Sequence, residues 1–176
     1  MFWKHGEQYA GLHRLIYKSE DTIYVGQDDF KSSKGRFILS EGFSRCNGIV
    51  FFDLYQQKGA LAHISPATDP RMLIVGEVGH VLGGGRRVER LGDCFPQPED
   101  VIVFNVCHSY AAAWCPEVVD TELGRLGFGI KDIRHVLLET IQDNSYVVHR
   151  AIALDTKMKE VYIFPNNNTS LIRVPF

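Results

Sequence analysis

Cys46 and His63 are the residues of this chain whose types and spacing point most directly to chemistry. They stand at the two ends of an apolar stretch that has the pattern of two strands around a polar turn, FSRCNGIVFFDLYQQKGALAHISP. A thiol that gives its proton to a neighbouring imidazole becomes a nucleophile, and the imidazole can return that proton to a departing amine. The pair therefore predicts acyl transfer from an amide or an ester.

The pairing of the two strands decides whether this thiol and this imidazole meet. An antiparallel hairpin with a four-residue turn at residues 53–56 places Cys46 directly opposite His63. Opposed Cβ atoms lie about 4.5–5.5 Å apart, which brings sulfur and imidazole within reach of a hydrogen bond. A turn at residues 56–59 would instead separate the two side chains along the strands.

Two glycines of the same stretch bear on access to the pair. Gly48 and Gly59 share its face in this hairpin, and we expect them to leave space above it for a substrate side chain. The alternative is that Cys46 is a small buried core residue and His63 a hydrogen-bonded strand histidine, which is the commoner situation for an arbitrary Cys and His.

Residues 40–66 carry a longer pattern, Ser40-EGFSR-Cys46-NGIVFF-Asp53 followed by Gly59-ALA-His63-IS-Pro66. This pattern resembles the chemoreceptor glutamine deamidases known as CheD. That family has a Thr, five residues and the nucleophilic Cys at the start of an apolar strand ending in Asp, then a turn, a Gly-x-x-x-His-like segment and a Pro. Its fold is shared with the cytotoxic-necrotizing-factor type of bacterial toxin, which also deamidates glutamine.

The resemblance implies a role for each matching residue. Cys46 becomes the nucleophile and His63 the general base and acid, while Ser40 takes the place of a supporting Thr that orients His63 or the substrate amide. The implied activity is hydrolysis of a protein glutamine side chain through a Cys thioester, without metal or cofactor. Capture of the same acyl-enzyme by an amine would give transglutamination, and both outcomes stay open.

Four residues near the pair are candidates for contact with the substrate: Arg45, Asn47, Gly48 and Gly59. Arg45 departs from the family pattern, which has a small residue before the Cys. Downstream, the segment LGFGIKDIRHVLLETI resembles a family helix and VVHRAIALDTKMKEVYIFP resembles its closing hairpin, although this hairpin lacks the family's glycines.

Local patterns predict the elements that would position these residues. The run at 49–52 is rich in β-branched and aromatic residues and predicts a strand. Further short runs predict strands at 22–25, 36–39, 60–65, 101–106, 145–154, 160–164 and 170–174. Apolar residues at helical spacing predict a helix over 131–141. Residues 70–82 are compatible with a helix or a strand, residues 32–35 with a turn, and the opening segment reads as irregular.

This inventory predicts an α+β fold with a layered, β-sandwich-like sheet core and one or two flanking helices. The length of 176 residues fits a single domain over residues 1–176, with residues 1–35 as a divergent N-terminal extension. A net charge of −2 argues against nucleic acid as a partner. No apolar run is long enough to span a membrane, and the N-terminus has no Sec-type signal. We therefore expect a cytoplasmic protein, or a secreted effector that needs no Sec signal.

Other reactive residues are weaker candidates. Cys107 and His108 are adjacent on a predicted strand and so point to opposite faces, which favours core packing. The four cysteines form no CxxC, and no Cys/His spacing specifies a metal site. His135, on the predicted helix, reads as an ordinary boundary residue. Two function classes remain: a deamidase acting on a protein glutamine, and a non-catalytic protein-binding domain on the same fold.

Overall fold

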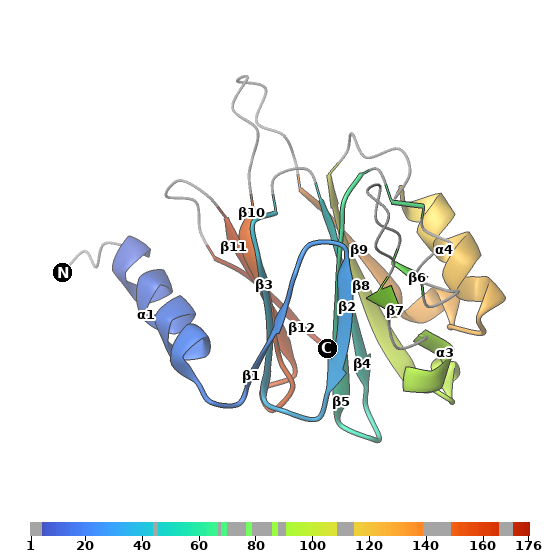
Figure 1. The fold of residues 1–176 in the computed structure, drawn as a ribbon, viewed down its shortest axis with the longest axis horizontal. Helices are drawn as coiled ribbons and strands as arrows, with labels where there is room; N and C mark the ends of the chain where they lie inside the picture. Colours follow the sequence, from blue (N-terminus) through green and yellow to red (C-terminus); the bar gives the residue numbers. More distant parts are fainter. Residues whose placement is uncertain are drawn as a thin grey trace.

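The computed structural model describes residues 5–43, 46–66, 68–69, 77–78, 86–87, 91–108, 115–138, 149–165 and 171–176. Within these ranges the chain forms two five-stranded β-sheets that face each other, here called sheet A and sheet B (Figure 1). Helices lie on the outer sides of this sandwich: α1 (His5–Lys18), α3 (Leu91–Cys94) and α4 (Pro116–Arg125). The α+β, sandwich-like fold predicted from the sequence is confirmed at this level.

Sheet A contains strands from the N-terminal and the C-terminal parts of the chain. Its strand order is β1 (Thr22–Val25), β3 (Phe37–Glu41), β10 (His149–Asp155), β11 (Glu160–Pro165) and β12 (Ile172–Pro175). β1 runs parallel to β3, and the other neighbours are antiparallel. The predicted closing hairpin is therefore present as β10 and β11.

Sheet B contains the stretch that carries Cys46 and His63. Its strand order is β2 (Asp29–Ser33), β5 (Lys58–Ile64), β4 (Asn47–Asp53), β8 (Val101–His108) and β9 (Ile133–Leu138). Only β8 and β9 are parallel. A separate two-stranded pair is formed by β6 (Glu77–Val78) and β7 (Arg86–Arg87). Of the ambiguous residues 70–82, only the strand β6 is described; the rest lie outside the described residues.

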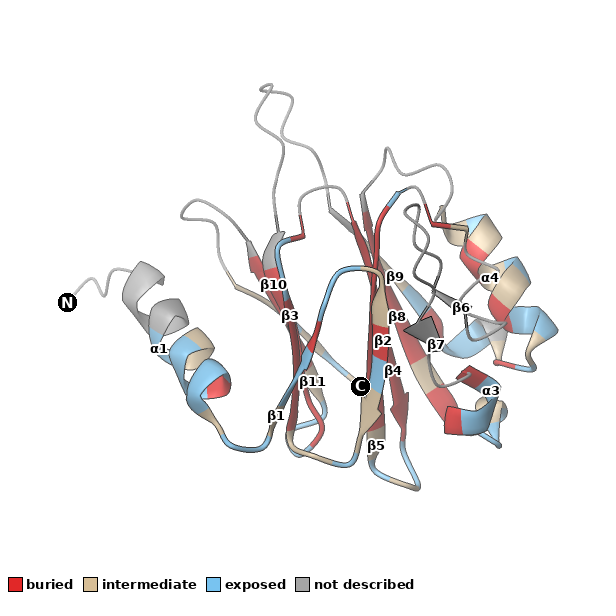
Figure 2. Cartoon of the chain, in the orientation of Figure 1, coloured by how far each residue is buried: buried red, intermediate tan, exposed pale blue. Residues whose placement is uncertain are grey.

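Buried apolar side chains form three layers. Figure 2 shows that buried residues follow the strands of both sheets. The central layer lies between the sheets and includes Val50, Phe52, Ile152 and Leu154. A second layer fills the space between the outer face of sheet B and the helices α3 and α4. The third lies between the outer face of sheet A and α1. Because side chains of one strand alternate between its faces, odd-numbered residues of β4 point outward and even-numbered ones point to sheet A.

The predicted helix over 131–141 is wrong. The chain instead makes a short 3-10 turn, η3 (Ile130–Asp132), and then strand β9, which pairs with β8. Ile133 packs in the layer under α4, whereas Val136 packs against the layer between the sheets. A strand that is apolar on both faces loses the alternation that marks a strand in sequence, and its residues then mimic helical spacing by chance.

The opening segment is not irregular. Helix α1 covers sheet A with Leu12 and Ile16, and Ile16 is fully buried. The predicted turn at residues 32–35 is also partly wrong, because β2 continues through Ser33. Phe30 of β2 is buried on the outer face of sheet B. Residues 22–33 thus supply one edge strand to each sheet.

Candidate functional site

His63 lies near the end of β5, on the face of sheet B that points to sheet A. Its partner across the β4–β5 ladder is Gly48, and Asp53 pairs with Lys58. The four-residue turn therefore comprises residues 54–57, and the predicted turn at 53–56 is wrong. The Asp53 side chain sets this register, because its Oδ1 accepts hydrogen bonds from the backbone N–H groups of Tyr55 and Gln56.

The new register changes how Cys46 relates to His63. Cys46 precedes β4 by one residue and belongs to the central apolar layer, on the same side of the sheet as Gly48 and His63. Extending the ladder would place Cys46 opposite Ser65, so Cys46 and His63 are diagonal neighbours rather than an opposed pair. Diagonal positions lie about 7–8 Å apart, a distance that side chains can partly close. The expected direct opposition is therefore wrong, but the shared face is correct.

Ser40 and His63 are in direct contact across the two sheets. Ser40 comes from β3 of sheet A, and its Oγ lies 2.8 Å from Nδ1 of His63. The single hydroxyl proton of Ser40 is donated to the carbonyl oxygen of Val25, 2.6 Å away. Ser40 must therefore accept from His63, which places the imidazole proton on Nδ1 and a lone pair on Nε2.

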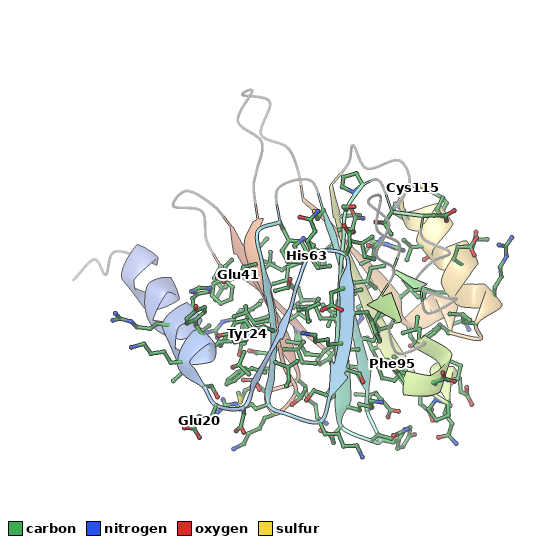
Figure 3. All side chains as sticks on the ribbon, viewed as in Figure 1. Glu20, Tyr24, Glu41, His63, Phe95 and Cys115 are labelled. Carbon is green, nitrogen blue, oxygen red and sulfur yellow. The ribbon has the colours of Figure 1, made fainter. Side chains whose placement is uncertain are left out.

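The Nε2 atom of His63 is buried and has no hydrogen-bond partner within the described structure. The ring of Phe43 stacks on the imidazole with centroids 3.8 Å apart. Burial lowers the pKa of His63 to about 4, while the Asp28 carboxylate opposes this change. At neutral pH the ring is therefore uncharged, with an unused basic nitrogen, as a general base requires. Figure 3 shows His63 between the two sheets, toward one end of the sandwich.

Both predicted catalytic side chains are buried. Cys46 has 6 % of its surface exposed and His63 has 1 %, so neither is open to bulk solvent in this conformation. Nε2 accepts no hydrogen bond from the Cys46 thiol. Residues 44 and 45, which directly precede Cys46, lie outside the described residues. One of them is the predicted substrate contact Arg45.

The predicted space above the pair is not present. A Cβ atom on Gly48 would overlap Cδ1 of Ile152 and lie 3.2 Å from Phe43, and one on Gly59 would overlap Cδ2 of Leu154. These glycines allow close contact between the two sheets, which leaves no room for a substrate side chain at that point. Asn47 is buried on the opposite, odd-numbered face of β4, away from His63.

Asp28 is a further charged residue near the site, and no pattern in the sequence singles it out. It lies just before β2, and its Oδ1 accepts hydrogen bonds of 2.8 Å from the Ser65 backbone N–H and from Oγ1 of Thr68. Burial alone would raise the pKa of Asp28, but the hydrogen bonds from Ser65, Thr68 and Gln27 outweigh it and hold the pKa below its ordinary value. The only clue in the sequence is an acidic residue between two short strands.

A second histidine, His135, lies on the outer face of sheet B. It is on a strand and not on the predicted helix. Its Nε2 lies 2.9 Å from Oδ1 of Asp120 on α4, and its Nδ1 lies 3.3 Å from Nδ2 of Asn105. Nearby Cys107 is buried, as expected for core packing, and burial raises the pKa of its thiol to about 11. The side chain of His108 lies outside the described residues.

Within the described ranges, no group of three or more His, Cys, Asp or Glu side chains is arranged to hold a metal ion. Over the same ranges, none of the helices combines the length and the apolar character that crossing a bilayer requires.

Comparison with known proteins adds little to this description. No protein-family model and no curated protein matches the chain. Among solved structures it is similar to the hypothetical protein YfiH of Bacillus licheniformis, with a TM-score of 0.44 and 11 % identity. The match covers 61 % of this chain and spans 50 % of that protein. A likeness of this size says nothing about activity.

Proposed function

We propose that the protein is a cysteine-dependent amidohydrolase that deamidates a glutamine side chain on a protein substrate. The observation that carries the proposal is the Ser40–His63 contact, which leaves a buried imidazole with a basic Nε2 on the face that Cys46 shares. The same three residues match the CheD-like pattern in residues 40–66, which supports a role for each.

The proposed reaction proceeds in two stages. Nε2 of His63 takes the thiol proton of Cys46, and the thiolate attacks the side-chain amide carbon of glutamine, while backbone N–H groups near Cys46 stabilise the oxyanion. His63 then gives its proton to the departing nitrogen, which leaves as ammonia and yields a thioester. In the second stage His63 takes a proton from water as the water oxygen attacks the thioester carbon. The C–S bond then breaks, His63 returns the proton to the Cys46 sulfur, and the glutamate side chain is released as a carboxylic acid that loses its proton to solvent.

Ser40 has a defined part in this cycle. Its bond to the Val25 carbonyl prevents it from donating to His63, so Nδ1 must carry a proton and Nε2 must act as the base. When the ring becomes charged, Ser40 continues to accept from Nδ1 and holds the imidazole in the same orientation.

Ammonia release tests the proposal. Purified protein is incubated with carbobenzoxy-glutaminyl-glycine and with a panel of candidate proteins, and the intact mass of each protein is followed for the exchange of an amide NH2 for OH. We expect release by wild type and a loss of at least about a thousandfold in Cys46→Ser and in His63→Asn, because a single catalytic member cannot act alone.

Cys107→Ser is the matched control, since Cys107 is also a buried thiol of sheet B but lies on the outer face, on the other side of the sheet from His63. Thermal unfolding verifies that each variant is folded. Activity retained by Cys46→Ser, or lost equally in the Cys107 control, would contradict the proposal.

The second candidate is a non-catalytic protein-binding domain, and the burial of the pair favours it. Cys46 and His63 expose 6 % and 1 % of their surfaces, and Phe43 covers one face of the imidazole. Alkylation by iodoacetamide separates the candidates, because an enzyme must expose its nucleophile during turnover. If Cys46 of the folded protein reacts no faster than Cys107 and no substrate is deamidated, the binding domain is supported.

A further inference from the structure

Asp28 is held firmly at the end of β5, close to His63. Its backbone has a positive φ of 53°, a conformation that Asp adopts more readily than most residues. Its carboxylate accepts from Ser65, two residues after His63, and from Thr68, whose backbone N–H in turn donates to the Ser65 carbonyl. Ser65 and Thr68 are both buried, so the carboxylate has a fixed place relative to the strand that carries the imidazole.

The pairing of β2 with β5 brings Asp28 next to the catalytic histidine. Asp29 pairs with His63, and Asp28 is the next residue along the chain. The Asp28 charge acts on the His63 imidazole and favours its protonated form. The low pKa of Asp28 means that this charge is present at neutral pH.

Two other acidic groups on the elements around His63 each contact a nitrogen of a neighbouring side chain. Asp29 lies 3.5 Å from the ammonium of Lys31 on the same strand, and Glu41 at the end of β3 lies 2.8 Å from Nε2 of His13. β4 contributes Gly48 to this side, Cys46 lies just before β4, and β10 contributes the apolar Ile152. Among the described residues Asp28 has no ion-pair partner.

We propose that Asp28 is a positioning residue that stabilises the imidazolium form of His63 whenever Nε2 carries a proton during turnover. The inference rests on the proposed function, because that reaction charges the imidazole in each stage. Ser40 offers only a hydroxyl dipole to the charged ring, and the surroundings are apolar. A carboxylate that is held in place close to a buried imidazole lowers the energy of the imidazolium without touching the substrate.

Two neighbouring substitutions test this role, Asp28→Asn and Asp29→Asn. Asn at position 28 retains an oxygen that accepts from Ser65 and Thr68 and tolerates a positive φ, so it removes the charge and preserves the shape. Asp29→Asn removes the same charge one residue away, from a carboxylate that pairs with Lys31 and, unlike Asp28, is not a cause of the pKa change at His63. Two quantities are measured: titration of the His63 ring by NMR, and the pH profile of ammonia release from carbobenzoxy-glutaminyl-glycine.

In Asp28→Asn we expect the His63 titration and the acid limb of the profile to move to lower pH, by a few tenths of a unit up to about one unit. The rate on the plateau falls about two- to tenfold, because the imidazolium is less stable. Asp29→Asn changes neither midpoint. A purely structural role for Asp28 would lower the melting temperature without moving either midpoint.

An unchanged His63 titration in Asp28→Asn, or an equal shift in both variants, would overturn the inference. The ring titration needs no turnover. If wild type releases no ammonia from any substrate, the proposed function is contradicted and the catalytic role of Asp28 falls with it, while the titration still shows whether Asp28 acts on His63.

Discussion

His63 and His135 lie on opposite faces of the same sheet and are held in different ways. His135 uses both ring nitrogens, one toward Asp120 and one toward Asn105, and it lies under helix α4. Among the described residues His63 has one hydrogen-bond partner, Ser40 at Nδ1, and none at its buried Nε2. On the outer face His135 therefore links a helix and a strand by hydrogen bonds, whereas on the inner face His63 keeps a ring nitrogen that can accept a proton.

The proposed reaction needs the arrangement found at His63 and not the one found at His135. A buried polar atom without a hydrogen bond costs roughly 1–3 kcal/mol, so a stable fold usually supplies a partner. The cost at Nε2 of His63 is explained if that atom takes up a proton in function. His135 has no comparable unused atom, and its neighbour Cys107 has a thiol that burial keeps protonated.

The largest expected effect is on the pH dependence of stability. His63 has a pKa of about 4 in the fold and about 6.5 in an unfolded chain, so the unfolded chain binds more protons between these values. Stability therefore falls as the pH is lowered through this window, by about 3 kcal/mol in total. Urea unfolding from pH 7 down to pH 4.5 measures most of this loss, at roughly 2–3 kcal/mol.

His63→Asn retains a side-chain N–H for Ser40 but does not titrate, so most of this pH dependence should disappear. His135→Asn serves as the control and should retain it, because His63 is still present. A pH dependence that is equal in wild type and His63→Asn would show that His63 is not buried as an uncharged ring.

A smaller effect is expected from Gly48→Ala, which changes the residue opposite His63. The new Cβ would overlap Ile152 and press on Phe43, the ring that stacks on the imidazole. We expect a loss of about 1–3 kcal/mol in the free energy of unfolding, measured with urea. In Gly92→Ala, where nothing lies within 4 Å of a Cβ, the change should stay below about 1 kcal/mol in either direction. Equal losses in both variants would contradict close packing of the sheets at Gly48.

The smallest effect is expected from Asp120→Asn, which alters the other histidine. His135 and Asp120 are both partly exposed, so their interaction is screened by solvent. We expect a loss of less than about 1 kcal/mol in the free energy of unfolding and no change in ammonia release. A loss of activity here would show that the outer face takes part in the reaction, and it would remove the distinction drawn between the two histidines.

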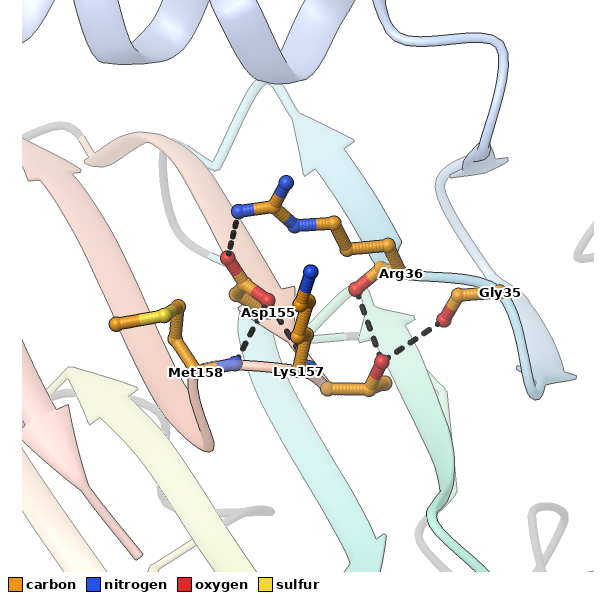
Figure 4. Close-up of polar contacts among 6 residues, drawn as sticks. Gly35, Arg36, Asp155, Lys157 and Met158 are labelled. Atoms are coloured by element: carbon orange, nitrogen blue, oxygen red, sulfur yellow. Dashed lines mark hydrogen bonds and ion pairs between the residues drawn. The ribbon is translucent and has the colours of Figure 1, made fainter.

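Two hairpins show how far the sequence predicts local structure. In β10–β11, Oδ1 of Asp155 accepts from the N–H groups of Lys157 and Met158, and Lys159 has a positive φ of 55° (Figure 4). In β4–β5, Asp53 and Gln57 occupy the equivalent positions. Both hairpins are predicted from alternating apolar runs around a polar turn. The predicted turn of the second hairpin begins one residue too early, because Asp53 is the last residue of the strand and does not belong to the turn.

Among the helices and strands, some are predicted from local pattern and others depend on tertiary contacts. Strands β4 and β8 are correctly predicted because they are short and rich in β-branched and aromatic residues. Strand β5 is correctly predicted as the short apolar run that follows the turn. Strand β9 was expected to be a helix, because burial on both faces removes the alternation that marks a strand. Helix α4 was not predicted, since its short buried stripe of Val119 and Leu123 is too sparse to be recognised without the sheet it covers.

Residue types and local patterns suffice to predict the α+β class, the hairpins and the choice of Ser40, Cys46 and His63 as candidates. The packing of the two sheets decides that Ser40 contacts His63, since the two residues come from different sheets. The tertiary structure also decides which ring nitrogen carries the proton, that Gly48 and not Cys46 lies opposite His63, and that Asp28 lies near the imidazole. These facts depend on strand register and sheet packing, which arise from contacts between residues far apart in the chain.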